Sequence, residues 1–445
     1  YSYINILKMR LGFIHWFKIK FRDYTVMKIL TKIFIPIYLM LEVIQGQCIG
    51  DLNTDYRIDQ NDLSIFSDYL LSANDTIINN ADIDYNNSLD IFDLISIINQ
   101  ITNNDLMWCE FENVDLSVEW EEQGNSSYYN DEDLESILNN EINNLSDIRG
   151  IIVIHRGKVV GENYYNNSSI SQNFNIWSVT KSYISTLVGQ AIDMGYIVDE
   201  YIMLDQVFVE NNYTNQVSIA HLLAMSSGWP ENWSYMNASN VLNMLLFTPL
   251  ISTPGTVFFY NNAACHINSH VLNTLTSMNP KEFAMEYLFP HIGIDNPSWT
   301  SDAVGVSNGS FGLYLSLREM VKLGQLYLQN GKSDDLQILS SDWIEKATST
   351  QINSGDGSGY GYLWWLTENA YLALGLGGQI IAVFPDQQLV VGAHSYTYSG
   401  NNHFSNLIDI IFSMILPIFD ISSDSFNYQL SAEYIKNISK TSVFK

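Results

Sequence analysis

Cysteine and basic side chains are both scarce in this sequence. Its three cysteines, Cys48, Cys109 and Cys265, have spacings that match no metal-binding or redox motif. The sequence leaves open whether Cys109 and Cys265 form a disulfide. Only 20 of the 445 residues are Lys or Arg, against 48 Asp or Glu, so the formal net charge is −28. A chain this acidic is expected to repel nucleic acid and anionic membranes, and we expect no nucleic-acid partner.

The apolar run at residues 33–41 is too short to span a bilayer comfortably. It follows Met27, Lys28 and Lys32, and a basic start before a short apolar stretch is typical of a secretory signal. We therefore interpret residues 1–47 as a leader and expect no membrane span in the mature chain. The predicted location is secreted, extracellular or at the cell surface, with the periplasm as a further option. An uncleaved membrane anchor is the competing interpretation.

The length and composition are compatible with two domains. A chain of 445 residues exceeds one typical domain, and a hydrophobic content of 47% is enough for a sizeable core. After the leader we divide the chain into a repeat region at 48–104, a linker at 105–118, a large mixed region at 119–420 and a polar tail at 421–445.

Two segments rich in Asp and Asn, at residues 51–62 and 82–93, form an internal repeat of 31 residues. Each copy places oxygen side chains at positions 1, 3, 5, 9 and 12 of a 12-residue loop, a spacing that surrounds calcium with hard oxygen ligands. A helical apolar pattern follows each loop. The predicted ligands of two calcium ions are Asp51, Asn53, Asp55, Arg57 (through its carbonyl), Asp59 and Asp62, then Asp82, Asp84, Asn86, Ser88 (through its carbonyl), Asp90 and Asp93.

This duplication resembles the dockerin family, whose loop–helix units bind two calcium ions and dock onto cohesin modules. The resemblance covers residues 50–103 and implies a small all-α, EF-hand-like module with a cohesin-like protein as partner. Loop position 6 departs from the common glycine and holds Tyr56 and Asn87, of which only Asn tolerates the left-handed conformation well. The alternatives are two ordinary polar turns, or a folding staple without a partner.

From about residue 119 the hydrophobic pattern becomes mixed. Strand-like segments at 148–153 and 158–161 precede helical periodicity at 180–194, 216–225, 263–276 and 312–329. Strands return near 359–365, 371–375, 378–384 and 388–395, before a helix near 403–417. This order indicates an α+β fold in which one antiparallel sheet is flanked by helices.

The run Ser178-Val179-Thr180-Lys181 has the residues of a nucleophile and its base. A serine hydroxyl needs a base within hydrogen-bond reach, and residues three apart at a helix start share one face. The helix N-terminus and the apolar residues that follow would lower the pKa of Lys181, so that it can accept the serine proton. The tetrapeptide alone is weak, because residues 442–445 match it too. A helix cap beside a surface lysine is the alternative.

The stretch FNIWSVTKSYISTLVG at 174–189 resembles the serine β-lactamase-related family. That family includes class C β-lactamases, D-amino-acid peptidases, esterases and 6-aminohexanoate-dimer hydrolases. Its second motif, Tyr-x-Asn after a Pro-Gly turn, is matched by Tyr260 and Asn262, and further family-like stretches begin at 221, 308, 359 and 375. These ordered matches imply a β-lactamase/transpeptidase-like fold, in which a helical domain lies beside the sheet.

The resemblance also implies a role for each motif residue. Ser178 would attack an ester or amide carbonyl. Lys181 and Tyr260 would pass its proton to the leaving group and later activate water. Asn262 would orient Lys181 or bind the substrate. The implied catalysis needs no cofactor, and the partner is a small ester, amide or peptide.

The edge of the site is expected at Gly377 and Gly378. There the resemblance implies an oxyanion hole made by the backbone N–H groups of Ser178 and Gln379. Family members that act on lactams or D-peptides usually carry Lys or His where this chain has Leu376, which cannot bind a substrate carboxylate. An ester or linear amide is therefore the predicted substrate. The alternatives are a β-lactamase, a D-amino-acid peptidase or penicillin-binding activity, and a catalytically silent ligand-binding protein of the same fold.

Overall fold

The computed structural model describes residues 50–52, 58, 60–72, 81, 83, 89, 91–103, 113–123, 130–211, 216–355, 359–396 and 402–419. The chain divides into two compact units, residues 1–112 and 113–445. The leader at 1–47 and the tail at 421–445 lie outside the described residues. So do most of the predicted calcium ligands: Asn53, Asp55, Arg57, Asp59, Asp82, Asp84, Asn86, Ser88 and Asp90.

The first unit repeats its structure with the offset of its sequence. Helices α3 (Gln60–Ser72) and α4 (Ile91–Asn103) have the same length and begin 31 residues apart. Phe66 of α3 and Ile97 of α4 are fully buried in one small core with Ala81. Further pairs with the same offset pack against this core: Leu52 and Ile83, Ile58 and Leu89, and Leu63 and Leu94.

The second unit contains an eight-stranded antiparallel sheet, so the predicted sheet is confirmed. Its strand order is β2-β1-β13-β12-β11-β10-β9-β8, which places the first two strands beside the last ones in the sequence. The strands are β1 (Ile148–His155), β2 (Lys158–Tyr164), β8 (Ile352–Asn353), β9 (Gly359–Tyr360), β10 (Trp365–Leu366), β11 (Tyr371–Gly375), β12 (Gln379–Phe384) and β13 (Leu389–Ser395).

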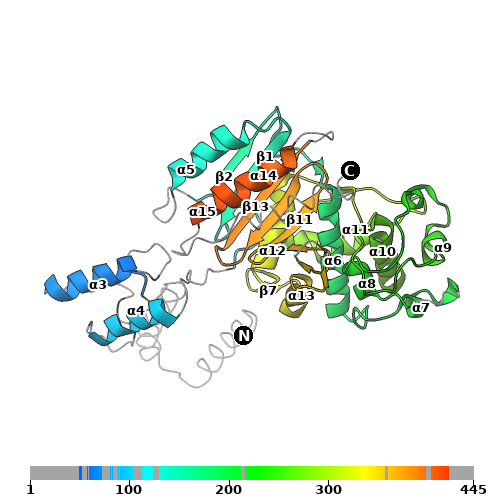
Figure 1. Cartoon of the computed structure of the whole chain (residues 1–445), viewed down its shortest axis with the longest axis horizontal. Helices are drawn as coiled ribbons and strands as arrows, with labels where there is room; N and C mark the ends of the chain where they lie inside the picture. Colours follow the sequence, from blue (N-terminus) through cyan, green and yellow to red (C-terminus); the bar gives the residue numbers. More distant parts are fainter. Residues whose placement is uncertain are drawn as a thin grey trace, which may run out of the picture. The chain divides into compact units, whose positions relative to one another are not determined.

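Helices cover both faces of this sheet (Figure 1). On one face lies α12 (Leu317–Leu328), whose Gly324 packs so closely that a side chain there would meet Ile381 at 2.6 Å. On the other face, Phe384 of β12 contacts Phe412 with ring centroids 5.2 Å apart. Successive strand residues point to opposite faces, and all residues of β12 are buried, so both of its faces are covered; after Gln379 every one of them is apolar. The covering segment on that second face consists of α14 (His403–Ile410), the π-helical turn η6 (Ile411–Ile415) and α15 (Leu416–Phe419).

A helical region occupies the chain between the two halves of the sheet (Figure 1). Helix α10 (Asn262–Thr276) packs against α6 (Thr180–Asp193), and twelve of the fourteen residues of α6 are buried. The neighbouring elements are α7 (Leu204–Val207), η3 (Val209–Asn211), α8 (Ile219–Leu223), η4 (Trp233–Asn237), α9 (Val241–Leu246), α11 (Pro280–Tyr287), η5 (Phe289–Ile292) and α13 (Ser341–Ala347). Helix α5 (Asp131–Ser136) and the π-helical turn η1 (Ile137–Ile142) precede the sheet. The described part of this unit also contains two small sheets. One joins β3 (Phe174–Asn175) to β5 (Leu313–Leu315) and β4 (Ser298–Trp299), and the other joins β6 (Lys332–Ser333) to β7 (Leu336–Gln337).

Two boundaries differ from the sequence prediction for physical reasons. The second unit begins at Asn113, inside the predicted linker, because Leu116 is buried and its N–H donates to Ser333 Oγ at 2.7 Å. The segment predicted as one helix at 312–329 starts as strand β5, and its helix begins only at Leu317. Ser316 caps that helix by accepting the N–H of Glu319. Within the described ranges, no helix is long and apolar enough to cross a bilayer.

Candidate active site

Ser178 lies in η2 (Trp177–Val179), the single 3₁₀ turn that leads into α6. The preceding residue, Trp177, has a φ of +47°, a conformation that bulky side chains rarely adopt. Its N–H donates to Asn175 Oδ1 at 2.9 Å, and Asn175 is itself held in the β3–β5 pairing. The strained residue is therefore fixed by its neighbours, and the half-buried Ser178 follows it directly.

Lys181 lies one turn further along and is almost completely buried. Its Nζ donates to Ser178 Oγ at 2.9 Å, to Asn262 Oδ1 at 2.8 Å and to the Ser310 carbonyl at 2.8 Å. The structure thus brings together three of the residues singled out in the sequence and adds Ser310. The side chain is neither on a solvated helix face nor near the surface, as the alternative of a cap beside a surface lysine requires.

Burial lowers the pKa of Lys181 to about 8. Cys265 and Glu231 would oppose this effect if both were charged. Burial also raises the pKa of the Cys265 thiol to about 11, so this thiol is neutral at neutral pH. Glu231 is therefore the neighbouring anion that matters. Cys265 is a free thiol in this structure, buried in α10 with its Sγ 3.5 Å from the Gly309 carbonyl oxygen.

The ring of Tyr260 also lies next to the Lys181 amine. Lys181 Nζ is 4.8 Å from the centroid of its ring, within the range of a cation–π contact. The ring stacks on Trp365 with centroids 5.7 Å apart and an interplanar angle of 15°. Burial raises the pKa of the Tyr260 hydroxyl well above its usual range, although a hydrogen bond with Ser178 opposes the shift. The hydroxyl is therefore protonated at neutral pH and lies within reach of the Ser178 oxygen.

Glu231 was not identified from the sequence, although it holds the second motif in place. Its Oε2 accepts the backbone N–H of Asn262 at 2.6 Å and the Asn262 side-chain Nδ2–H at 3.1 Å. Its Oε1 accepts the N–H of Ala263 at 3.2 Å, so the carboxylate lies at the N-terminus of α10, where negative charge is favourable. The contact spans 31 residues, and no local pattern in the sequence signals it.

Ser310 was also missed, although a family-like stretch begins two residues before it. Its carbonyl accepts from Lys181, and its own hydroxyl donates to the Asn262 carbonyl at 2.6 Å. Its backbone N–H donates to Asn308 Oδ1 at 2.8 Å. Ser310 thereby ties the loop after β4 to both Lys181 and α10.

The turn at Gly377 and Gly378 joins β11 to β12 beside η2. Both glycines have positive φ, +87° and +100°, and a side chain on Gly378 would lie 2.9 Å from Ser395 Oγ. A side chain on Gly375, at the end of β11, would lie 2.5 Å from the Ile176 carbonyl, so the strand edge approaches the turn that carries Ser178. The Gln379 side chain is buried and bonds to the backbone of Ser395 on β13. The part of Gln379 left for an oxyanion is thus its backbone N–H, whose predicted role stays a prediction.

Three aromatic rings line the surface next to the nucleophile. Trp177 precedes Ser178 and Phe311 follows Ser310, and their ring centroids are 6.2 Å apart. Trp233 lies 6.2 Å from Phe311 by the same measure and is 60% exposed. We call these three residues the aromatic rim. By contrast, Trp229 is buried in the core and donates from Nε1 to the Thr248 carbonyl at 2.9 Å.

Of the predicted calcium ligands, the described residues include Asp51, Asp62 and Asp93, all three buried. Asp62 Oδ1 accepts the N–H of Leu52 at 2.7 Å, and Asp93 Oδ1 accepts the N–H of Ile83 at 2.8 Å. The last residue of each loop therefore makes the same contact with the second residue of its own loop. Calcium binding itself stays a prediction.

The fold and the serine–lysine site are those of a serine hydrolase of the β-lactamase and penicillin-binding type. A family profile described as Beta-lactamase matches residues 138–409, which is more than half of the sequence. The chain belongs to the β-lactamase family. The predicted family fold is confirmed with it.

The chain is similar in sequence to the 6-aminohexanoate-dimer hydrolase of Paenarthrobacter ureafaciens, with 22% identity over 58% of this chain and 74% of the relative. In structure it resembles EstCE1, described as a hydrolase with promiscuous acyltransferase activity, with a TM-score of 0.56 and 14% identity over 65% of this chain and 99% of that one. It also resembles a penicillin binding protein from Bacillus halodurans, with a TM-score of 0.51 and 16% identity over 63% of this chain and 99% of that one. At these identities the structural likeness establishes the fold alone.

Proposed function

We propose that the second unit hydrolyses an ester or a linear amide through an acyl-enzyme on Ser178. The observation that carries this proposal is the contact of 2.9 Å between Ser178 Oγ and the buried amine of Lys181. A buried amine with a pKa of about 8 is neutral in about a tenth of the molecules at pH 7 and can then accept a proton.

The two other contacts of Lys181 orient its lone pair. A protonated amine has three N–H bonds, and the structure offers three acceptors for them: Ser178 Oγ, Asn262 Oδ1 and the Ser310 carbonyl. In the neutral amine, Asn262 and Ser310 still accept the two remaining N–H bonds. The lone pair then faces the Ser178 hydroxyl, which is the orientation that a general base requires.

The proposed reaction has two halves. In the first, Ser178 Oγ bonds to the substrate carbonyl carbon and its proton moves to Lys181. The alcohol or amine then leaves with a proton that Lys181 supplies through the Tyr260 hydroxyl. In the second, a water molecule gives a proton along the same route and attacks the ester bond to Ser178, which releases the acid and restores the hydroxyl. The tetrahedral intermediates would be stabilised by the backbone N–H groups of Ser178 and Gln379.

Two observations favour an uncharged or weakly charged substrate with an apolar chain. The aromatic rim lies next to Ser178, and aromatic surface binds apolar groups. Leu376 provides no cation at the turn where a substrate carboxylate would be bound. The relative from Paenarthrobacter ureafaciens is named for hydrolysis of an amide dimer, which is consistent with a linear amide as one substrate class.

The test compares hydrolysis of p-nitrophenyl butyrate, a linear amide, a D-Ala-D-Ala peptide and a cephalosporin by the wild type and by Ser178→Ala and Lys181→Ala. The matched controls are Ser442→Ala and Lys445→Ala, which alter the second copy of the tetrapeptide. We expect ester or linear amide turnover that the first two variants lose and the controls retain. Turnover that survives Ser178→Ala would refute the proposal, and preferential turnover of the peptide or the cephalosporin would refute the substrate class.

We also propose that the first unit binds two calcium ions. The supporting observation is the identical placement of Asp62 and Asp93, two buried carboxylates in equivalent positions of a duplicated loop. Buried carboxylates are favoured when a cation neutralises them. Calorimetric titration of the full chain should give two sites, and Asp62→Asn and Asp93→Asn should each remove one. Binding that both variants leave unchanged would contradict this.

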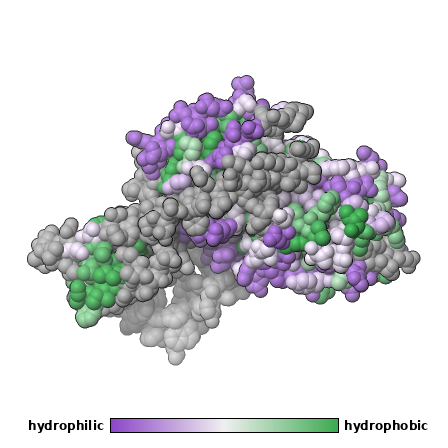
Figure 2. All heavy atoms as spheres, viewed as in Figure 1, coloured by the Kyte–Doolittle hydropathy of each residue, from purple (hydrophilic) through white to green (hydrophobic). Residues whose placement is uncertain are grey.

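The surface of α4 supports a protein partner of the cohesin type. Four apolar residues on one face of α4 are exposed, and Figure 2 shows apolar atoms at the surface of this unit. They are Ile91, Phe92, Ile95 and Ile98, and the equivalent residues of α3 are all polar, namely Gln60, Asn61, Ser64 and Ser67. At these four positions the second copy therefore carries apolar residues where the first carries polar ones.

We propose that this asymmetry directs a cohesin-like domain to α4. Replacing Phe92 by Asn and Ile95 by Ser transfers the α3 residues to α4 and should abolish capture of the full chain by a purified cohesin, whereas Asn61→Ala should not.

We also propose that the chain is exported by means of the leader at residues 1–47. N-terminal sequencing of protein recovered from the culture medium tests it, and a mature chain that retains residue 27 would contradict it.

A further inference from the structure

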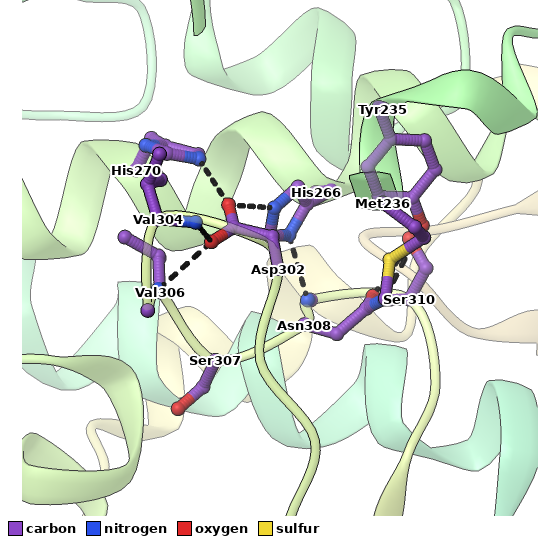
Figure 3. Close-up of polar contacts among 12 residues, drawn as sticks. Tyr235, Met236, His266, His270, Asp302, Val304, Val306, Ser307, Asn308 and Ser310 are labelled. Atoms are coloured by element: carbon purple, nitrogen blue, oxygen red, sulfur yellow. Dashed lines mark hydrogen bonds and ion pairs between the residues drawn. The ribbon is translucent and has the colours of Figure 1, made fainter. Parts of the chain in front are cut away.

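A buried cluster of two histidines and one aspartate lies beside the candidate active site (Figure 3). His266 and His270 are one turn apart on α10, and both Nε2 atoms point to Asp302 Oδ2, at 2.9 and 3.0 Å. The other carboxylate oxygen of Asp302 accepts the N–H groups of Val304 and Val306. Nothing in the proposed reaction uses these side chains.

The hydrogen bonds of His266 assign its tautomer. Its Nδ1 accepts the backbone N–H of Gly309 at 3.1 Å, so this nitrogen carries no proton. The ring proton of neutral His266 is therefore on Nε2 and is donated to Asp302. Burial lowers the pKa of His266 to about 4, which keeps the ring neutral at physiological pH.

The same assignment argues against a metal ion at this cluster. Two histidines four apart on a helix with a nearby carboxylate are a common set of zinc ligands, and these three groups are close enough together to hold an ion. A neutral histidine that binds a metal through Nε2 must carry its proton on Nδ1. In this structure the Gly309 N–H points at Nδ1 of His266, so a proton on Nδ1 would face another N–H group instead of an acceptor.

The cluster is connected to Lys181 through a short segment of backbone. Gly309, whose N–H is held by His266, directly precedes Ser310, whose carbonyl accepts from Lys181 Nζ. A side chain on Gly309 would lie 2.6 Å from Ser269 Oγ, so this segment lies directly against α10. His270 shares Asp302 with His266, and its Nε2 lies 3.0 Å from Asp302 Oδ2.

We propose that His266 is a positioning residue, which fixes the backbone at Gly309 and thereby the adjoining Ser310, so that the Ser310 carbonyl orients Lys181. Asp302 holds the ring of His266 in the tautomer and orientation that accept the Gly309 N–H. The proposal rests on the proposed function, in which Lys181 is the base for Ser178. Loss of this contact frees the carbonyl to move, and a displacement of about 1 Å in a positioning group can reduce a rate on the order of 100-fold.

Two variants of His266 separate the two hydrogen bonds of its ring. In His266→Asn the side-chain oxygen takes the place of Nδ1 and can still accept the Gly309 N–H, but the contact with Asp302 is lost. In His266→Gln the terminal amide takes the place of Nε2 and can still donate to Asp302, but the acceptor for Gly309 is lost. His270→Gln alters the same carboxylate without changing the Gly309 contact and is the matched control.

The assay measures kcat and KM for p-nitrophenyl butyrate and the rate at which a fluorophosphonate labels Ser178, each below the melting temperature of the variant. We expect His266→Gln to lower kcat and the labelling rate at least about tenfold with KM within about twofold, whereas His266→Asn and His270→Gln stay within about threefold of the wild type. A purely structural role through Asp302 predicts the reverse order of the two His266 variants and would overturn the proposal. Zinc found at one ion per chain in the purified protein, and lost in His266→Gln and His270→Gln alike, would overturn it as well. If the wild type itself is not labelled at Ser178, the proposed function fails instead.

Discussion

Replacing Glu231 by glutamine should move the pH dependence of hydrolysis to lower pH. Burial lowers the pKa of Lys181 to about 8, and the negative charge of Glu231 partly opposes that effect. The two groups are connected through Asn262, whose Oδ1 is 2.8 Å from Lys181 Nζ and whose Nδ2 is 3.1 Å from Glu231 Oε2. Removing the anion should therefore lower the pKa of Lys181 further.

The size of the effect follows from this geometry. Two hydrogen bonds and one amide group separate the charges, so they are at most about 8 Å apart, and their Coulomb energy at an effective dielectric constant of about 20 is about 2 kcal/mol. This energy corresponds to about 1.5 pH units. Because the neutral amine is the active form, kcat/KM rises with pH through the pKa of Lys181. Its rising limb should move from about pH 8 to about pH 6.5.

The assay is the pH profile of kcat/KM for p-nitrophenyl butyrate between about pH 5 and 10, with the melting temperature measured at each pH. Glu231→Asp keeps the charge and is the control, so its rising limb should stay near that of the wild type even if its stability falls. A limb that stays in place in Glu231→Gln, or moves to higher pH, would show that Lys181 is not the titrating base.

Three further predictions concern other parts of the second unit. Trp233→Ala should raise KM for esters of long acyl chains about tenfold and leave acetate esters nearly unchanged, whereas the exposed Phe247→Ala should have no effect on either, as a series of p-nitrophenyl esters would measure. Burial lowers the pKa of His394 to about 3 from 6.5, so the unfolded chain binds its proton first and stability should fall as the pH drops below 6.5. Urea unfolding at pH 6.5 and pH 5 should show that His394→Leu removes about 2 kcal/mol of this loss. Leu376→Lys should increase hydrolysis of a D-Ala-D-Ala peptide relative to an ester, and an unchanged ratio would place the determinant of carboxylate binding elsewhere.

The sequence predicted those parts of the site whose geometry is local. Ser178 and Lys181 lie three residues apart at a helix start, and their contact follows from the pitch of that helix. Tyr260 and Asn262 could be named only through the family motif, since their position beside Lys181 depends on how α10 packs against α6. The alternation and order of apolar segments were enough to predict the antiparallel sheet.

The contacts that were missed connect distant parts of the chain through polar groups. Glu231 reaches Asn262 from a loop, and the Ser310 carbonyl reaches Lys181 across 129 residues. Every residue has a backbone carbonyl, so the residue type does not show which carbonyl will accept a hydrogen bond from Lys181. A single glutamate in an acidic chain is equally hard to single out from the sequence. The second unit begins inside the predicted linker because Leu116 is buried there, and this burial depends on contacts with distant residues such as Ser333.

The most direct test of the central claim is the site of covalent labelling by a fluorophosphonate, measured by intact mass and peptide mapping on the full chain. The structure predicts one adduct per chain on Ser178, none in Ser178→Ala, and labelling slowed at least about 100-fold in Lys181→Ala because the hydroxyl loses its base. An adduct on another residue, or labelling that Lys181→Ala leaves at the wild-type rate, would contradict the assignment of Ser178 and Lys181 as nucleophile and base.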